Sequence, residues 1–293
     1  MALNLAQIKE LHAAGKLIGL HDVEELAYHA GPGVSQSTLK AFKLSPAHGK
    51  AQMDKHSEPT AAMKLGTAVH CAVLEPKRFD SLYVGAPDIK RNSNAGKEAY
   101  AAWASENVGK EIIDGDDLAL VKKMREAVRA HEVAATLTTG VIEQAAYWID
   151  ETTGLLCKCK PDAIVFEQGV ILDLKTTNDD ATEKAFGKAV GNYGYHIQAA
   201  FYLDGVKEAL KQSSVVDSRS VGLQSTPERF VFLVVEKSAP HGVALFELDF
   251  SDLCIGREAY KKYLQELAIC QMENYWPSYR QGIQTIKIPT WAL

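Results

Sequence analysis

The sequence of 293 residues lacks any apolar run approaching the roughly 18 residues that a membrane-spanning helix requires. It also lacks an excess of basic residues, since its formal net charge is −5. Proteins that coat nucleic acid tend to be basic, so this charge argues against a passive DNA-binding module. It does not exclude an enzyme, because a metal site itself requires carboxylates.

The apolar stretch near the start of the chain carries four polar or charged residues, Lys9, Glu10, His12 and Lys16. This pattern predicts an amphipathic helix and not a signal peptide. We therefore expect a cytoplasmic protein that has no membrane partner.

Cysteine is scarce, with five residues and no spacing typical of a disulfide framework. An odd count of this kind favours reduced thiols in an intracellular setting. Cys157 and Cys159 are too close together for the usual zinc knuckle, and no second pair follows. We interpret them as strand residues that point to one face.

The proportions of hydrophobic residues, 46%, and charged residues, 24%, are those of a soluble globular protein. No linker is long enough to force two domains, so residues 1–293 are expected to form a single domain. Hydrophobic periodicity predicts a mainly helical N-terminal part over residues 1–140, with helices at about 3–15, 35–44, 63–74, 97–106 and 116–131 and a loop at about 86–97.

The pattern changes at Val141, where alternating residues predict a three-stranded meander over about 141–149, 155–166 and 170–174. A helix at about 194–212, strands at about 229–236 and 243–249, and a long helix at about 251–274 follow. This order predicts an α/β (α+β) fold with a mixed central sheet flanked by helices. The core would span 141–250, and 251–293 would form a C-terminal helix and tail.

Two aspartates on neighbouring predicted strands are the first candidates for chemistry. Asp162 and Asp173 lie on either side of the turn at Gly169, so they can occupy adjacent strand positions with converging carboxylates. Two such charges about 4 Å apart repel by about 4 kcal/mol at an effective dielectric constant near 20. Either one carboxylate is protonated or a cation binds between them, and all-oxygen ligation suits Mg²⁺ or Mn²⁺.

Lys175 favours the metal interpretation, because two residues after Asp173 it projects to the same face of the strand. A lysine there can orient a metal-bound water, assist its deprotonation or neutralise charge on a phosphate. Leu174 would point into the core while its backbone carbonyl remains free to bind the metal. The alternative is a surface Asp-Lys pair next to an ordinary turn aspartate.

Pro161-Asp162 followed by Asp173-Leu174-Lys175 resembles the motif of the PD-(D/E)XK nuclease superfamily. Gly66-Thr-Ala-Val-His70 and Gln198-Ala-Ala-Phe-Tyr202 are similar to the histidine motif and the Q-x-x-x-Y helix of its RecB-like, exonuclease VIII (RecE-type) branch. The segments Gly33–Leu39 and Ser45–His48 resemble the N-terminal portion of phage-encoded members. The resemblance covers residues from about 28 to about 250 and implies a restriction-endonuclease-like core.

The resemblance implies that Asp162 and Asp173 are metal ligands, that Lys175 is the catalytic lysine and that His70 is a further ligand. Taken alone, His70 would be interpreted as a buried structural histidine on an apolar helix. Glu143 is a candidate carboxylate behind the metal ligands, and an exposed strand residue is the equal alternative.

Gln198 and Tyr202 lie four residues apart, on one helical face. They either reach the scissile nucleotide or hold Lys175, or else they form a polar stripe on an exposed helix. For DNA binding, Ser35 and Ser37 with Lys40 could form a phosphate site at a helix N-terminus, although simple capping also explains the serines. Lys184 and Lys188 would add positive charge to a DNA groove.

The function implied is an Mg²⁺-dependent exonuclease, for which Mn²⁺ could substitute, acting 5′→3′ on linear double-stranded DNA. The resemblance also implies a homo-oligomeric ring, a single-strand annealing partner, phage-type recombination and a bacterial or phage-infected host cell. An iron–sulfur cluster is not expected, because the sequence has no Cys-x-x-Cys. The alternatives are an endonuclease or flap-type repair nuclease on the same core, and a DNA-binding or assembly protein with a decayed site.

Overall fold

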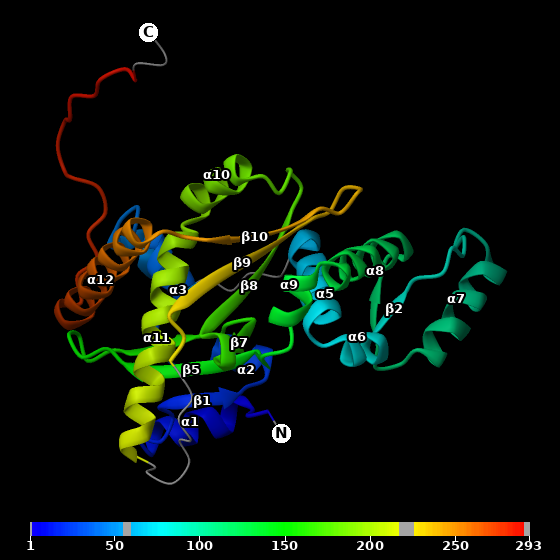
Figure 1. Cartoon of the computed structure of the whole chain (residues 1–293), viewed down its shortest axis with the longest axis horizontal. Helices are drawn as coiled ribbons and strands as arrows, with labels where there is room; N and C mark the ends of the chain where they lie inside the picture. Colours follow the sequence, from blue (N-terminus) through cyan, green and yellow to red (C-terminus); the bar gives the residue numbers. More distant parts are fainter. Residues whose placement is uncertain (1, 55–59, 217–225, 290–293) are drawn as a thin grey trace.

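The protein is described by a computed structural model that covers residues 2–54, 60–216 and 226–289. A mixed five-stranded sheet lies at its centre (Figure 1). Its strands, in spatial order, are β10 (Val243–Glu247), β9 (Arg229–Glu236), β8 (Val170–Thr177), β7 (Ala163–Val165) and β4 (Val141–Ile142). In this sheet β8 and β9 run parallel, and the other three neighbouring pairs are antiparallel. The predicted fold class, a mixed sheet flanked by helices, is confirmed.

A second, antiparallel sheet consists of β1 (Gly19–Asp22), β5 (Gln144–Ile149) and β6 (Leu156–Cys159). The predicted three-stranded meander is confirmed in its pairing, because residues 141–149 pair with 156–165 and residues 163–165 pair with 170–172, all antiparallel. Its division was not predicted, since the first two strands are each divided between the two sheets. The register is kept across the division, but Glu143 adopts a left-handed conformation with φ 49° and Pro161 has no N–H to donate. The paired strands bend at this point.

Helices cover both faces of the central sheet (Figure 1). The N-terminal part contributes α1 (Leu5–Ala13), α2 (Glu25–Ala30), α3 (Gln36–Ala41), α4 (Pro46–Met53), α5 (Ala61–Leu74), α6 (Pro76–Leu82), α8 (Gly115–Ala130) and α9 (Glu132–Leu137). A projecting arm contains β2 (Tyr83–Gly85), α7 (Asn94–Glu106) and β3 (Glu111–Ile113). The last helices are α10 (Glu183–Tyr193), α11 (Tyr195–Val216) and α12 (Phe250–Glu273), and a short 3-10 turn spans Phe166–Gln168.

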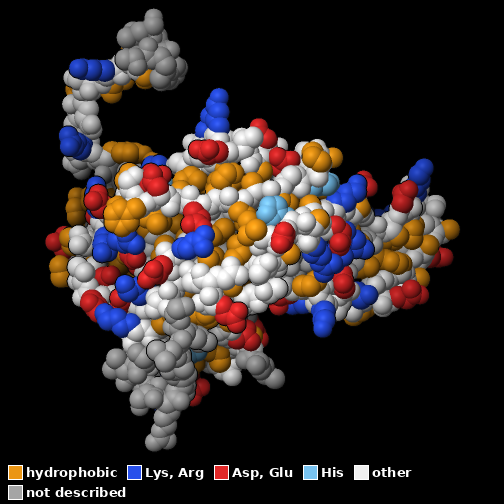
Figure 2. All heavy atoms as spheres, in the orientation of Figure 1, with side chains coloured by type: hydrophobic (Ala, Val, Ile, Leu, Met, Phe, Trp, Pro, Cys, Tyr) orange, Lys and Arg blue, Asp and Glu red, His pale blue; other side chains and the backbone are white. Residues whose placement is uncertain are grey.

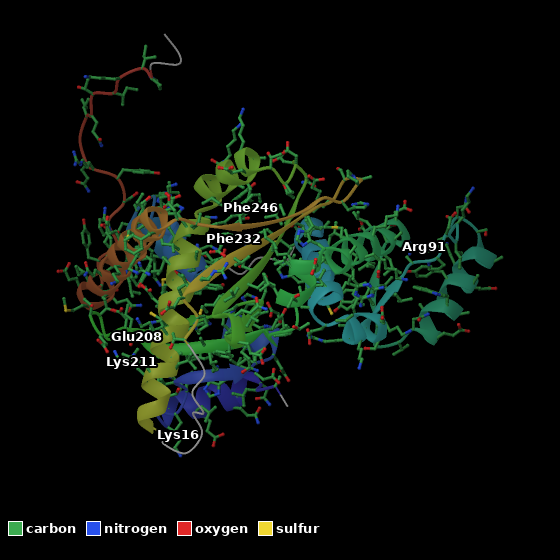
Figure 3. All side chains as sticks on the ribbon, viewed as in Figure 1. Lys16, Arg91, Glu208, Lys211, Phe232 and Phe246 are labelled. Carbon is green, nitrogen blue, oxygen red and sulfur yellow. The ribbon has the colours of Figure 1, made fainter. Side chains whose placement is uncertain are left out.

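Strand β9 shows how the sheet separates two cores. Phe230, Phe232 and Val234 pack with α11 and α12, whereas the alternate residues Val231, Leu233 and Val235 pack with α5 and α8. Figure 3 shows Phe232 and Phe246 below α10, and their rings both contact Phe186 of that helix. A strand buried on both faces is apolar at every position, and this is why the run at 229–236 was readable in the sequence.

The cysteine interpretation is confirmed. Cys157 and Cys159 are free thiols on β6, and both are buried in the same core. Lys158 between them is also buried, but it points away and donates hydrogen bonds to the carbonyls of Tyr28 and Gly31 at 2.6 and 2.7 Å.

Within the described residues, no helix is long and apolar enough to cross a membrane.

Helices α11 and α12 are joined by a polar contact and a close backbone approach. Asp204 accepts hydrogen bonds from Arg257 Nε and Nη2 at 2.7 and 2.8 Å and from the Tyr260 hydroxyl at 2.6 Å. Next to Arg257, Gly256 packs so closely against the start of α11 that a Cβ there would lie 2.2 Å from the His196 carbonyl oxygen. The N-terminus of α11, which carries Gln198, is therefore held in place by α12.

The Gly256→Ala variant should lower the free energy of unfolding by about 1–3 kcal/mol, because a fixed backbone atom occupies the space of the new methyl group. Gly187→Ala is the matched control, since a Cβ at this helical position meets nothing within 4 Å. That variant should gain up to about 1 kcal/mol. Urea unfolding of the two variants would contradict this packing if both were stabilised.

Candidate active site

The candidate site lies where β8 separates from β7. The two strands pair only as far as Leu172, and from Asp173 onward β8 pairs with β9 alone. Asp162, in the turn just before β7, takes the vacated place, and its Oδ2 accepts a hydrogen bond from the Leu174 N–H at 2.6 Å. The carbonyl of a strand residue points to the same side as its N–H. The Leu174 carbonyl is thus directed to the side where Asp162 lies.

Asp173 projects from β8 into the buried interior and is only 3% exposed. Its Oδ1 accepts a hydrogen bond from Gln198 Nε2 at 2.5 Å, and its Oδ2 lies 2.5 Å from Lys175 Nζ. Among the described residues, Oδ2 accepts no hydrogen bond of normal geometry, and its contact is the ion pair with Lys175. This oxygen therefore keeps coordinating capacity.

His70 reaches the same site from α5, on the other side of the sheet edge. Its Nδ1 lies 3.2 Å from Asp162 Oδ1. Each aspartate is thus accompanied by one cationic or potentially cationic side chain, Asp162 by His70 and Asp173 by Lys175. The structure brings together the histidine, both aspartates and the lysine that the sequence selected.

The pKa values of the two carboxyl groups are shifted in opposite directions. Burial raises the pKa of Asp162, but its attraction to and hydrogen bond with His70, its attraction to Lys175 and the hydrogen bond from the Leu174 N–H together outweigh burial, so the pKa of Asp162 is lowered overall. Burial lowers the pKa of His70, and Asp162 reverses this, so the pKa of His70 is raised. Burial, helped by repulsion from Asp162, raises the pKa of Asp173 despite Lys175. Asp173 is therefore the carboxyl group whose negative charge most needs a further cation.

Side chains of α11 contact both Asp173 and Lys175. Gln198 is buried and holds Asp173, and it also bonds to the buried hydroxyl of Tyr202, whose pKa burial raises. Tyr195, one turn before Gln198, places its ring centroid 4.7 Å from Lys175 Nζ. Tyr195 is not among the site residues predicted from the sequence. Its spacing of three residues before Gln198, on the same helical face, was the signal that could have found it.

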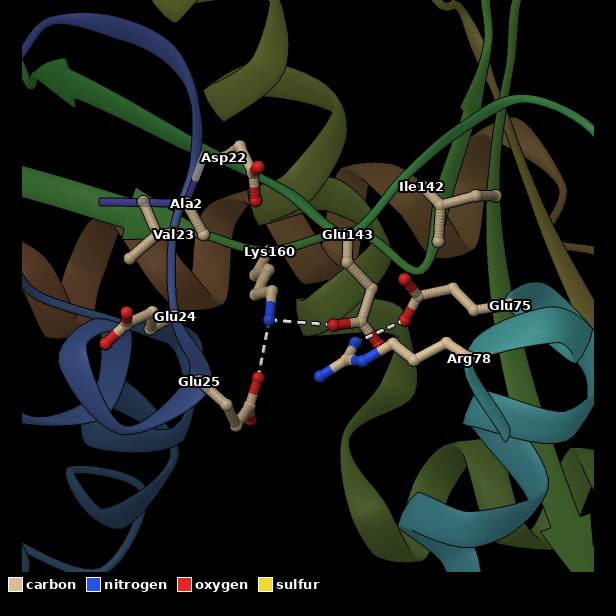
Figure 4. Close-up of a pocket in the computed structure, with 10 residues that line it drawn as sticks. All are labelled: Ala2, Asp22, Val23, Glu24, Glu25, Glu75, Arg78, Ile142, Glu143 and Lys160. Atoms are coloured by element: carbon tan, nitrogen blue, oxygen red, sulfur yellow. Dashed lines mark hydrogen bonds and ion pairs between the residues drawn. The ribbon is translucent and has the colours of Figure 1, made fainter. Parts of the chain in front are cut away.

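Glu143 contacts the site only through its backbone, whose N–H donates to the Asp162 carbonyl at 3.1 Å. Its side chain turns into a neighbouring cavity of about 330 Å³, where it lies 2.8 Å from Lys160 Nζ (Figure 4). Lys160 also pairs with Glu25, and across the cavity Arg78 pairs with Glu75. The Glu143 carboxylate thus faces a separate group of ion pairs.

The candidate DNA-binding residues are spread over two helices. Ser35 is the N-cap of α3, but its hydroxyl bonds to the Ser37 and Thr38 hydroxyls at 2.8 and 3.2 Å and not to a helix N–H. Lys184 and Lys188 are exposed on α10. Figure 2 shows Lys and Arg side chains interspersed with Asp and Glu on the visible face, without a continuous basic stripe.

The donor set fits a divalent cation that takes part of its coordination from water and phosphate. Among the described residues, no three His, Cys, Asp or Glu side chains form a ready cluster for a metal ion. Two carboxylates and the directed Leu174 carbonyl are nevertheless present, and Asp173 Oδ2 keeps a lone pair. Mg²⁺ is typically held by one or two carboxylates together with substrate oxygens, so a complete protein cage is not required.

A mixed sheet with two aspartates and a lysine at its opened edge defines a nuclease fold of the PD-(D/E)XK type. Residues 35–289 match the family model described as a PDDEXK-like domain of unknown function, and the chain belongs to this family. The predicted membership of the PD-(D/E)XK superfamily is thereby confirmed.

The fold is also similar to a crystal structure described as a "Putative exonuclease" from Eubacterium rectale. The TM-score is 0.53 and the sequence identity is 15%, with 88% of this chain and 90% of that chain covered. At this low sequence identity, the similarity shows a shared fold and nothing about function. No curated protein matches the chain.

The hydrogen bond between Gln198 and Asp173 can be tested without substrate. Gln198→Leu leaves a buried carboxylate oxygen without its donor and should cost about 1–3 kcal/mol of unfolding free energy in metal-free buffer. In the Asp173→Ala background most of this cost should disappear. Gln212, on the same helix, bonds to the backbone of Ile149 instead. Gln212→Leu should cost the same in both backgrounds, and an equal cost of Gln198→Leu in both would exclude the coupling.

Proposed function

We propose that this protein is a metal-dependent deoxyribonuclease, and specifically an exonuclease acting on linear double-stranded DNA. The observation that carries the proposal is the meeting of Asp162, Asp173 and Lys175 where β8 leaves β7, with Asp173 Oδ2 accepting no hydrogen bond of normal geometry from the described residues. The family and the shared fold support the same chemistry.

In this proposal Asp162, Asp173 and the Leu174 carbonyl hold Mg²⁺, for which Mn²⁺ can substitute. The bound cation would polarise the scissile phosphate and lower the pKa of a water molecule. His70 contacts Asp162 through Nδ1, which leaves Nε2 as the ring nitrogen for the metal. Gln198 fixes the orientation of the Asp173 carboxylate.

Lys175 supplies a positive charge that does not depend on the metal. Burial lowers the pKa of Lys175, but attraction to Asp173 and Asp162 outweighs burial, so its pKa is raised and it stays protonated. A buried ammonium at this position stabilises negative charge that develops on the phosphate oxygens. Tyr195 holds the ammonium against its ring face.

The resemblance described above favours 5′→3′ digestion, a ring-shaped homo-oligomer and a single-strand annealing protein as partner in phage-type recombination. A ring would also account for the acidic net charge of −5, because a protein that encloses DNA needs fewer phosphate contacts than one that binds it on an open surface. Ser35, Ser37, Lys40, Lys184 and Lys188 are the candidates for contacts to the phosphates.

Digestion of end-labelled linear duplexes, with and without a 5′-phosphate, tests the proposal in Mg²⁺ and in EDTA. Cleavage should require the metal and should fall by about 100-fold or more in Asp173→Asn and in Lys175→Ala. The exposed residues Asp116 and Lys16 provide matched controls, and Asp116→Asn and Lys16→Ala should cleave as the wild type does.

Covalently closed circular DNA separates the alternatives. An exonuclease leaves the circle intact, whereas an endonuclease or flap-type nuclease nicks or cuts it. DNA binding without any cleavage by the wild type, in Mg²⁺ and in Mn²⁺, would instead identify a binding protein with a decayed site and defeat the proposal.

A further inference from the structure

Two tyrosines next to the site are brought together by a single glycine. Tyr193 ends α10, Tyr195 begins α11, and Gly194 between them adopts a left-handed conformation with φ 67°. This conformation is easy for glycine and costly for other residues. The sharp bend at Gly194 brings the two rings to a centroid separation of 5.5 Å.

The inner ring is part of the core and touches the active lysine. Tyr195 packs against Phe186 and Phe232, with centroid separations of 6.0 and 5.8 Å. Lys175 Nζ lies 4.7 Å from its centroid. Tyr195 is therefore a fixed support between the lysine and the outer ring.

The outer ring, Tyr193, is 54% exposed, so part of its surface is open to a ligand. Lys40 of α3 places its Nζ 5.6 Å from the centroid of this ring. No carboxylate pairs with Lys40 among the residues that the structure describes. Burial, and then repulsion from Lys43 and Lys175, lower the pKa of Lys40. An anion bound here would relieve an uncompensated charge.

An exposed aromatic ring beside an unpaired ammonium is the combination that binds single-stranded nucleic acid, because the ring stacks on a base and the ammonium pairs with the phosphate. The Tyr193 ring lies 5.5 Å from the Tyr195 ring, whose centroid lies 4.7 Å from Lys175 Nζ. This path corresponds to no more than a few nucleotides of a strand, at roughly 3.4 Å each. The strand that reaches Lys175 would therefore pass Tyr193.

We propose that Tyr193 and Lys40 form a nucleotide subsite, in which the ring stacks on an unpaired base and the ammonium pairs with a flanking phosphate. A base inside a duplex is covered on both faces by its neighbours, so Tyr193 can take an interior base of the strand only after that base has left its own stack. The strand therefore enters the site unpaired, and the preferred substrate is a frayed or single-stranded DNA end. This inference rests on the proposed deoxyribonuclease function and specifies its substrate.

The test measures binding of short single-stranded oligonucleotides that carry 2-aminopurine at the 5′ end or, in a second probe, at the 3′ end. Measurements in EDTA prevent cleavage. Stacking on Tyr193 should quench the fluorescence of one probe bound to the wild type. Tyr193→Ala should lose this quenching and bind about tenfold more weakly, the order expected for one stacked base, while Tyr193→Phe should keep both.

Two residues that lie away from the subsite serve as controls. Tyr100→Ala removes a ring of the projecting arm that also lies beside a cation, Arg91, and should leave quenching and affinity unchanged (Figure 3). Lys40→Ala should reduce the slope of log Kd against log salt by about 0.7, the value expected for one lost phosphate contact on a single strand. Lys16→Ala, near the end of α11 that is distant from Tyr195 (Figure 3), should leave the slope unchanged.

Quenching and affinity at wild-type levels in Tyr193→Ala, or an unchanged salt slope in Lys40→Ala, would overturn the subsite. These outcomes are distinct from failure of the proposed function. A wild type that shows the quenching but never cleaves DNA would defeat the nuclease proposal and leave the subsite standing. Cleavage together with full quenching in Tyr193→Ala would defeat the subsite alone.

Discussion

The buried charge of Asp173 is the constraint on which the rest of the site depends. A carboxylate taken out of water costs several kcal/mol unless it is compensated, and Asp173 is only 3% exposed. Gln198 donates a hydrogen bond to one of its oxygens, and Lys175 forms an ion pair with the other, which accepts no hydrogen bond of normal geometry from the described residues. The β7–β8 pairing ends at Leu172, one residue before Asp173, and the start of α11 brings Gln198 to Asp173. Because α12 approaches α11 closely at Gly256, its packing also fixes Gln198.

The elements that were predicted correctly are those in which the pattern of apolar side chains follows their burial. Strand β9 reads as an apolar run, and α5, α8 and α12 show clear helical periodicity, so their bounds agree with prediction to within a few residues. The short strands β1, β2 and β3 and the helices α2, α4, α6, α9 and α10 were not predicted. Their formation depends on partners distant in the sequence, as when Gly19–Asp22 pairs with β5.

The site shows the same contrast between residues related by a local pattern and residues placed by distant partners. Asp162, Asp173 and Lys175 were found because strand periodicity alone relates them, and the resemblance to a known superfamily added His70 and Gln198. Periodicity could not show that Glu143 turns its carboxylate toward Lys160, since this follows from a left-handed φ of 49°. Nor could it show that Gly194 brings Tyr193 and Tyr195 together, or that Lys40 reaches them from α3.

The chemistry that we propose requires a divalent cation between Asp162 and Asp173. Anomalous diffraction from crystals soaked in Mn²⁺ locates the ion directly. We expect a peak within coordination distance of Asp173 Oδ2, with Lys175 Nζ moved away from that oxygen, and no such peak in Asp173→Asn. An ion bound only in the neighbouring cavity, beside Glu75 and Glu143, or no ion in a soaked wild-type crystal, would contradict it.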